Sequence, residues 1–288
     1  MISSNPLQMI RSLTELKQIR RELAPALRIG FVPTMGALHQ GHLALVRRSL
    51  DECDLTFVSI FVNPLQFGPK EDFSQYPRPL DKDLELLRAE EADFVFTPET
   101  SEFYASDFST FVSEESVSAP LCGALRPGHF KGVTTVVLKL FNLVRPDLAY
   151  FGQKDAQQCA VIERMVRDLN FPIQIVRCPT LREKDGLAIS SRNIYLSVAE
   201  RTKAHLIYDS LQVALQHFRQ GERSTDKLLQ VGRAVFEKEP LFKLQYWEIR
   251  DPVTMELVTG QIGSRGALIA VAAFLGKTRL IDNWDLKN

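Results

Sequence analysis

Two histidines stand three residues apart in a segment that also contains glycines and follows an apolar run near the start of the chain. Because residues three apart share one face of a helix, His39 and His42 could both donate hydrogen bonds to a phosphate as charge develops on it. Gly36 and Gly41 would let the backbone approach that phosphate, and a helix N-terminus would offer it free N–H groups. The pattern indicates a phosphate-binding turn. The alternatives are an ordinary turn with structural histidines, or a metal pair, which no carboxylate or cysteine at metal-ligand spacing accompanies.

Two further polar segments contain residue types that bind phosphates. Lys154 and Asp155 follow an apolar run and a glycine; a lysine suits a point-charge contact with phosphate, and the carboxylate could hold ribose hydroxyls or orient the loop. Ser190, Ser191 and Arg192 offer two hydroxyls beside a guanidinium, which indicates a polyphosphate-binding group. The alternatives are a surface ion pair for the first segment and a helix cap for the second.

Two glutamines belong to these polar clusters: Gln66 follows the strand-like run that ends at Val62, and Gln158 lies just after Lys154 and Asp155. An amide side chain both donates and accepts hydrogen bonds without charge, so it suits a substrate with hydroxyl and carboxylate groups. Either glutamine alone could equally be a solvated surface side chain.

The elements that must position these residues alternate between strands and helices. Apolar β-rich runs predict strands at Leu27 to Val32, Leu55 to Val62, Asp93 to Thr97, Leu148 to Phe151 and Ile173 to Cys178. Between them, helical patterns occur at Leu43 to Asp51, Asp81 to Ala92, Thr134 to Val144 and Ala156 to Asn170. This alternation predicts a parallel sheet with helices on both faces, in the α/β class.

The polar clusters all follow predicted strands, so they should gather at one edge of this sheet. In open parallel sheets, ligands bind beyond the carboxyl ends of the strands. The turns expected at the other edge, Ala24-Pro25 and Asn170-Phe171-Pro172, contain no comparable groups. The sequence therefore predicts one site built from clusters that are far apart along the chain.

The pattern changes after about Pro179. Two long helical stretches, Val198 to Gln220 and Ser224 to Glu239, precede strand-like runs at Leu244 to Arg250, Ala267 to Phe274 and Thr278 to Asn283. This order predicts a smaller α+β domain with antiparallel strands. We place the domains at residues 1–180 and 181–288, with the site between them.

Composition excludes several classes of protein. The 288 residues carry 35 Lys+Arg and 35 Asp+Glu, so net charge gives no reason to expect nucleic acid or an anionic membrane as the main partner. The N-terminus lacks the apolar run of a signal peptide, and no apolar stretch is long enough to span a bilayer. The four cysteines form no CxxC pair and indicate reduced thiols. We expect a soluble cytoplasmic protein.

Five longer segments resemble one enzyme family. They are PTMGALHQGH (33–42), FVNPLQF (61–67), LRPGHFKGV (125–133), YFGQKDAQQ (150–158) and DGLAISSRNIYL (185–196). In order and spacing they are similar to the pantothenate synthetase (pantoate–β-alanine ligase) family, within the HxGH-type nucleotidyltransferase superfamily. The resemblance extends from about residue 28 to 197, and the C-terminal part fits the family's small lid domain by size and pattern.

The resemblance implies a set of ATP-binding residues. His42 would be the proton donor, with His39 beside it, and Lys154 and Arg192 would contact the phosphates. Leu181 would contact adenine through its backbone. The complete implied set is Met35, Gly36, Ala37, Leu38, His39, Gln40, Gly41, His42, Gly152, Gln153, Lys154, Asp155, Leu181, Ile189, Ser190, Ser191 and Arg192.

The resemblance also implies a pantoate site and a metal. Gln66 and Gln158 would hold pantoate, and Gln66 would also lie near β-alanine. Asn63, Arg126 and His129 would be further members of the pocket. For Mg²⁺ the family pattern places an acidic residue after Tyr76-Pro77-Arg78. Asp83 matches it best and position 82 is a lysine, so ATP itself would supply most of the metal's ligands.

The implied reaction joins (R)-pantoate to β-alanine through a pantoyl-adenylate, releasing AMP and pyrophosphate, in a Rossmann-like homodimer. Two alternatives are a different nucleotidyltransferase acting on a phosphorylated small molecule and a non-catalytic nucleotide sensor. Gln66 and Gln158, in place of additional Lys or Arg, argue against the first, and both histidines with Lys154 argue against the second. A relative of aminoacyl-tRNA synthetases is disfavoured because no basic surface or tRNA-reading domain is evident.

Overall fold

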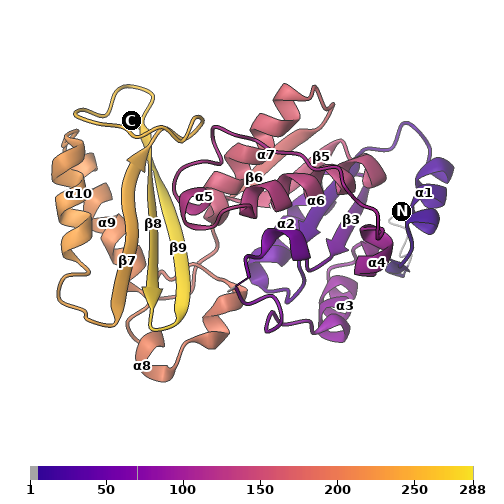
Figure 1. The fold of residues 1–288 in the computed structure, drawn as a ribbon, viewed down its shortest axis with the longest axis horizontal. Coiled ribbons are helices and arrows are strands. Elements are labelled where there is room, and N and C mark those ends of the chain that lie inside the picture. The colour runs from indigo at the N-terminus through magenta and orange to yellow at the C-terminus, as the bar shows by residue number, and fades with distance from the viewer. Residues whose placement is uncertain (1–5, 70, 288) are drawn as a thin grey trace. The chain divides into compact units, whose positions relative to one another are not determined.

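The computed structural model describes residues 6–69 and 71–287, and these residues form two compact units (Figure 1). The first unit contains the chain up to Gly152 and the segment Val161–Cys178. The second contains Gln153–Ala160 and the chain from Pro179 onward. Helix α7 (Ala156–Asp168) therefore contributes to both units. A single domain boundary near residue 180 stays a prediction.

The first unit is built on a six-stranded sheet whose strand pairs are all parallel. The predicted Rossmann-like parallel sheet is thus confirmed. The short strand at one edge, β1, has only three residues and was not predicted. Across the sheet the strands lie in the order β1 (Gln8–Ile10), β4 (Phe94–Phe96), β3 (Leu55–Ile60), β2 (Ile29–Thr34), β5 (Leu148–Gly152) and β6 (Gln174–Cys178).

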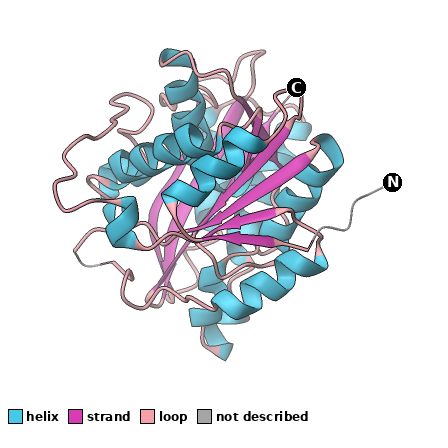
Figure 2. Cartoon of the chain, turned by 90° about the vertical axis from the view of Figure 1, so that its right-hand side faces the viewer, coloured by secondary structure: helices cyan, strands magenta, loops and turns pink. Residues whose placement is uncertain are grey.

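Helices flank this sheet because its central strands are apolar on both sides (Figure 2). In β2, Phe31 meets Phe141 edge to face, with ring centroids 6.4 Å apart, whereas Val32 packs in a cluster with Leu45 and Val46. Successive strand residues point to opposite faces, so each face buries its own core. The helices and short 3₁₀ turn of this unit are α1 (Leu13–Glu22), α2 (Gln40–Glu52), η1 (Pro64–Gln66), α3 (Leu80–Ala89), α4 (Thr100–Phe103), α5 (Cys122–Leu125) and α6 (His129–Val144).

Helix α6 begins at His129, five residues before the predicted start at Thr134. Gly132 in its first turn weakens the helical signal in the sequence. The structure gives the reason for this glycine: a Cβ there would lie 2.2 Å from the Leu65 carbonyl oxygen. A residue that disfavours a helix is thus required where the η1 backbone packs against α6.

The second unit is α+β, as predicted, with an antiparallel sheet ordered β7 (Phe242–Arg250), β8 (Ala267–Leu275), β9 (Thr278–Leu286). Helices α9 (Leu206–Arg219) and α10 (Thr225–Ala234) pack on this sheet (Figure 1). The single helix predicted at Val198 to Gln220 is wrong, because the chain forms α8 (Val198–Arg201) and then turns before α9. No glycine or proline marks that break in the sequence. Two 3₁₀ turns complete the unit: η2 (Gln153–Asp155) and η3 (Ser191–Tyr195).

Candidate active site

The predicted site residues of the first unit follow the central strands of its sheet. From β2 the chain runs through β3 and β4 to one side, and β5 and β6 lie on the other, so the order of strands reverses between β2 and β5. Thr34, the last residue of β2, pairs in register with Ile60, the last residue of β3. The Met35–His42 and Asn63–Gln66 segments therefore leave the sheet side by side. Gly152 ends β5 on the other side of the reversal, where ligands bind in folds of this kind.

The two histidines of the HxGH segment stack at the start of α2. Their rings lie 4.0 Å apart at an interplanar angle of 26°, which confirms that they share one face. His39 is the N-cap residue, and its Nδ1 accepts a hydrogen bond from the Gly41 N–H at 3.1 Å. A neutral imidazole that accepts at Nδ1 carries its proton on Nε2. His39 is therefore held in the tautomer that can donate a hydrogen bond.

A buried carboxylate shapes the turn that precedes these histidines. Asp83 of α3 is 1% exposed, and its two oxygens accept hydrogen bonds from the Ala37 N–H (2.8 Å) and the Leu38 N–H (2.7 Å). The Thr34 hydroxyl accepts a third from the Gly36 N–H at 3.1 Å. Ala37 has a φ of 50°, which non-glycine residues rarely adopt. The side chains of Asp83 and Thr34 thus stabilise an unfavourable backbone conformation.

This role gives Asp83 a structural function, and the expectation that it is a Mg²⁺ ligand stays a prediction. Both carboxylate oxygens are already bonded to backbone amides, and burial raises the pKa of this carboxyl against the effect of those bonds. Within residues 6–69 and 71–287, no group of three or more His, Cys, Asp or Glu side chains could hold a metal ion. The described residues thus give no support for a metal site held by the protein alone, and the protein's share in binding Mg²⁺ stays a prediction.

The glycines of the turn also have a structural requirement of their own. A Cβ on Gly36 would lie 2.9 Å from Asp83 Oδ2, and one on Gly41 would lie 2.9 Å from the His39 ring. The sequence led us to expect that both glycines make room for phosphate. The observed neighbours show that they make room for the side chains that build the turn, and any contact with phosphate stays a prediction.

The amide of Gln66 is held by that of Asn63. Gln66 is 8% exposed and Asn63 is 1% exposed. Asn63 Nδ2 donates to Gln66 Oε1 at 3.0 Å, and Gln66 Nε2 donates to the thioether sulfur of Met35 at 3.0 Å. The structure therefore brings Gln66, one of the two predicted pantoate residues, to the first residue of the predicted ATP-binding turn.

Arg126 and His129 support the backbone of Gln66. His129 Nδ1 lies 2.8 Å from the Gln66 carbonyl oxygen, and its Nε2 lies 3.0 Å from Arg126 Nη1. The Arg126 guanidinium pairs with both oxygens of Glu71, each at 2.6 Å. Burial raises the pKa of Glu71, but the bonds and charge of Arg126 outweigh it, and that pKa lies below its ordinary value. Glu71 was not identified from the sequence, because nothing in its own segment indicates a partner at position 126.

In the second unit, strand β9 holds the segment that contains Lys154. Asn283 Nδ2 donates to the carbonyl oxygens of Gln153 (2.8 Å) and Lys154 (2.9 Å). The Lys154 ammonium lies 3.8 Å from Asp155 Oδ1, so this residue pair forms only a long ion pair. Sequence reasoning missed Asn283, because it lies in a strand without a recognisable motif.

The same strand anchors the loop that contains Ser190 and Arg192. Arg182 pairs with Asp282 of β9 at 2.5 and 3.0 Å, and its guanidinium lies 4.8 Å from the Tyr208 ring centroid and 5.1 Å from that of Trp284. Burial raises the pKa of Asp282, and the Arg182 guanidinium opposes this. Asp282 is a second residue that sequence reasoning missed.

The rest of this loop is ordered by its own backbone. The Ile189 N–H donates to the Leu181 carbonyl at 3.0 Å, which closes a small hairpin. Ser190 then caps η3, its hydroxyl accepting from the Arg192 N–H at 3.3 Å. The alternative that these residues cap the helix beginning at Val198 is wrong, because Ser197 caps α8 with Glu200 in a capping box. Roles for Leu181, Ile189, Ser191 and Arg192 toward ATP stay predictions.

The other predicted residues lie at element ends. Gln40 is the first residue of α2 and is exposed, and Gln158 lies half-buried in the first turn of α7. Their contacts with substrates stay predictions.

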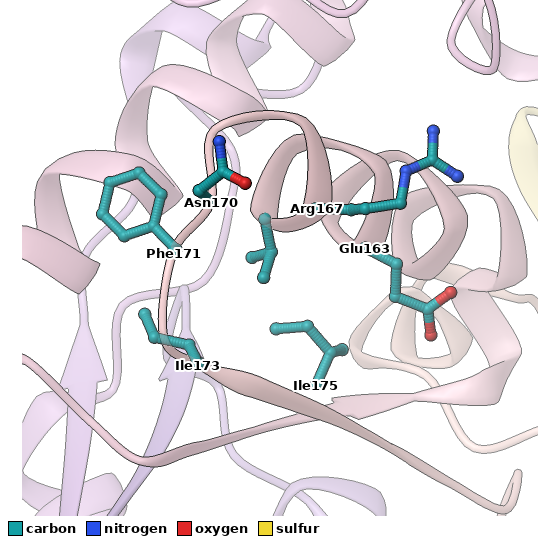
Figure 3. Close-up of a pocket in the computed structure, with 7 residues that line it drawn as sticks. Glu163, Arg167, Asn170, Phe171, Ile173 and Ile175 are labelled. Carbon is teal, nitrogen blue, oxygen red and sulfur yellow. The ribbon is translucent and has the colours of Figure 1, made fainter.

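A cavity of about 410 Å³ in the first unit lies away from all of these residues (Figure 3). It opens between the end of α7 and β6, beside the Asn170-Phe171 turn that we expected at the other edge of the sheet. A hollow of this size need not be a reaction site, and this one contains none of the predicted functional residues.

Comparison with known proteins agrees with this geometry. The family model for pantoate-beta-alanine ligase matches residues 8–285. The pantothenate synthetase of Pseudothermotoga lettingae is 52% identical over 274 residues, covering 95% of this chain and 97% of the relative. That of Thermotoga neapolitana is 51% identical over 278 residues, covering 96% and 99%.

Solved structures agree as well. The pantothenate synthetase of Thermus thermophilus superposes with a TM-score of 0.93 at 44% identity, covering 98% of this chain and all of that one. The Francisella tularensis pantoate-beta-alanine ligase, complexed with beta-gamma ATP and beta-alanine, gives a TM-score of 0.79 at 32% identity, covering 97% of both chains.

The fold and the Met35–His42 turn, which contains the HxGH segment, define an enzyme with a Rossmann-like nucleotide-binding domain. Described residues form no helix long and apolar enough to cross a membrane. The chain belongs to the pantoate–β-alanine ligase family.

Proposed function

We propose that this enzyme condenses (R)-pantoate with β-alanine, using ATP to form a pantoyl-adenylate. The supporting observation is the 3.0 Å hydrogen bond from Gln66 Nε2 to the Met35 sulfur. This bond holds a neutral, oriented amide, which suits a carboxylate-bearing substrate, beside Met35, the first residue of the Met35–His42 turn. A carboxylate held there would face a nucleotide whose phosphates this turn would bind.

The chemistry requires two displacements. A carboxylate oxygen of pantoate attacks the α-phosphorus of ATP, and the bond from that phosphorus to the bridging oxygen breaks, releasing pyrophosphate. The free amine of β-alanine then attacks the acyl carbon, AMP leaves with the electrons of the acyl–oxygen bond, and the nitrogen loses a proton. Adenylation is needed because an amine cannot displace oxide from a carboxylate. The enzyme's task is positioning and charge stabilisation.

Each group of side chains has a proposed role in these steps. The donor tautomer of His39 and the stacked His42 stabilise charge on the phosphates, with His42 as the proton donor. Lys154 and the Ser190–Arg192 segment hold the departing pyrophosphate. Gln66 and Gln158 hold pantoate, and Gln66 also lies near β-alanine. Asn63, Arg126 and His129 keep Gln66 in place.

Three finer points belong to the same proposal. Mg²⁺ would enter with ATP, which would supply most of its ligands, since that ion keeps several waters and is commonly bound through substrate phosphates. The enzyme acts as a homodimer. It works in the cytoplasm, where its four cysteines stay reduced.

An isotope-exchange assay tests the proposed function. With labelled pyrophosphate, label should enter ATP when pantoate is present and β-alanine is absent, and exchange should stop when pantoate is omitted. Adding β-alanine should yield AMP. Release of ADP and phosphate would overturn the mechanism, because it would show attack at the γ-phosphorus. Exchange that requires a phosphorylated small molecule in place of pantoate would instead support a different nucleotidyltransferase.

A further inference from the structure

The hydroxyl of Tyr104 lies at the end of a hydrogen-bond chain that leads to Gln66. Tyr104 directly follows α4, and its O–H donates to Asn63 Oδ1 at 2.9 Å. Asn63 Nδ2 then donates to Gln66 Oε1 at 3.0 Å. Neither the sequence motifs nor the roles assigned above include Tyr104, which is 41 residues from Asn63 along the chain.

Backbone groups determine the direction of this chain. The Leu65 N–H, which can only donate, points at Asn63 Oδ1 (3.3 Å), and the Gly132 carbonyl, which can only accept, faces Asn63 Nδ2 (3.1 Å). With Tyr104 and Gln66 as the other two partners, the Asn63 amide makes all four of the hydrogen bonds available to it. An amide turned over by about 180° would place donor against donor and acceptor against acceptor.

The orientation of Asn63 in turn determines that of Gln66. Because Asn63 Nδ2 is a donor, Gln66 must turn its oxygen toward Asn63 and its NH₂ group away, where that group meets the Met35 sulfur. One N–H of this group donates to the Met35 sulfur, so Gln66 can offer its second N–H to a ligand. Such a site suits a carboxylate or hydroxyl oxygen and disfavours an ammonium group in the same place.

Neighbouring side chains hold the ring of Tyr104 so that its hydroxyl stays directed at Asn63 Oδ1. The Lys139 ammonium lies 5.5 Å from its centroid, 5.1 Å from that of Phe103 and 4.9 Å from that of Phe108. The Phe108 and Tyr104 rings also meet edge to face at 4.9 Å. Burial raises the pKa of Tyr104 well above its ordinary value, so the hydroxyl keeps its proton.

We propose that Tyr104 is a positioning residue that locks Asn63, and through it the donor-outward orientation of Gln66, which selects an oxygen-bearing substrate. This inference rests on the proposed function, in which Gln66 binds pantoate. Tyr104 itself touches no substrate in this scheme. Its effect should therefore fall on pantoate affinity and leave the chemical step unchanged.

Tyr104→Phe removes the hydroxyl and keeps the ring. Because Leu65 still donates to Asn63, we expect a loss typical of one hydrogen bond, a rise of about three- to tenfold in the pantoate KM. The ATP KM and kcat should each stay within about twofold of the wild-type values, a smaller change than that expected in the pantoate KM. Tyr150→Phe is the matched control: it also removes a hydrogen-bonded phenol hydroxyl of the first unit, whose partners are Glu52 and Cys53 and not Gln66. It should leave the pantoate KM unchanged.

A double-variant cycle separates this inference from the proposed function. In a Gln66→Ala background, Tyr104→Phe should have no further effect on pantoate, because the residue it acts through is absent. An equal effect in both backgrounds, or an unchanged pantoate KM in Tyr104→Phe while Gln66→Ala raises it, would overturn the role of Tyr104 and leave the proposed function intact. If the wild-type enzyme shows no pantoate-dependent exchange of pyrophosphate, the proposed function fails and this inference fails with it.

Discussion

Two regions that carry predicted functional residues are stabilised in different ways. The Met35–His42 turn and the adjoining Asn63–Gln66 segment are held mainly by buried hydrogen bonds to backbone amides, from Asp83, Thr34 and Asn63. The loop from Leu181 to Arg192 is held at its base by guanidinium–carboxylate pairs, through Arg182 and Arg201.

This difference has a functional meaning. Hydrogen bonds to fixed backbone groups hold a side chain within a narrow geometry, which suits groups that must orient a reacting carboxylate and phosphate. Ion pairs on a loop respond to charge, and a triphosphate would bring several negative charges to that loop. We infer that the first region is preorganised and that the second adapts to its ligand. The predictions below test this contrast, beginning with the largest expected effect.

His42→Ala should reduce turnover by about a hundredfold or more, the range for losing a residue that transfers protons or stabilises charge in the transition state. The His42 side chain stacks on His39 in the turn and fills no part of the apolar core, so we expect the fold to survive. Steady-state kinetics would measure the loss, and circular dichroism with a thermal melt would confirm folding. His217→Ala, an exposed histidine at the end of α9, is the control. A folded His42 variant with a wild-type rate would contradict the assignment.

Arg182→Met should destabilise the second unit by about 3–5 kcal/mol, because it leaves the buried Asp282 without its partner. A melt followed by Trp fluorescence would measure this loss. The double variant Arg182→Met with Asp282→Leu should recover most of the stability, since an apolar pair of similar volume often replaces a buried ion pair. If the double variant is as unstable as the single one, the pair is not what anchors the loop.

Asp83→Asn should raise the ATP KM about tenfold. The asparagine side chain has one acceptor oxygen, whereas two backbone N–H groups each need an acceptor. One hydrogen bond is therefore lost, which costs about 1–3 kcal/mol. The Mg²⁺ concentration that gives half-maximal activity should not change. Asp81→Asn, an exposed carboxylate on the same helix, is the control and should match the wild type. A change in the Mg²⁺ concentration that gives half-maximal activity, with an unchanged ATP KM, would support Asp83 as a metal ligand.

The fate of these residues shows what a sequence can predict. That His39 and His42 share one face followed from their spacing, because such an arrangement is local, and their stacking confirms it. The parallel sheet followed from alternating apolar runs, and with it the shared edge where β2 and β3 end. Both depend only on short-range pattern.

The sequence did not reveal partners that are distant along the chain. The role of Asp83 in the turn could not be predicted, because nothing near it shows that its oxygens bond to amides 45 and 46 residues away. Tyr104 and Asn283 went unnoticed for the same reason, since each acts through a residue far along the chain. Neither lies in a motif that marks it, so only the folded arrangement identifies them.

The smallest expected effect concerns the ion pairs of Arg201, which bonds Asp185 and Glu183 at 2.6 Å each. The hydrogen bond from Arg201 lowers the pKa of Asp185 below its ordinary value. A carboxyl with a lowered folded pKa stabilises the fold above its unfolded pKa of about 3.9, and that contribution is lost as the pH falls through the folded pKa. All three side chains are about one-third exposed, so solvent screening should keep the contribution below about 1 kcal/mol. Arg201→Gln should therefore lower Tm slightly at about pH 7 and not at all once Asp185 and Glu183 are both protonated.

Hydrogen exchange of residues 181–189 should rise in wild type when NaCl is increased to high concentration, with no change at residues 63–66. Arg201→Gln should abolish that salt response. Arg219→Gln, an exposed arginine in the last turn of α9, should keep it. If salt loosens both segments equally, the contrast between a region ordered by hydrogen bonds to fixed backbone groups and a loop ordered by ion pairs is wrong.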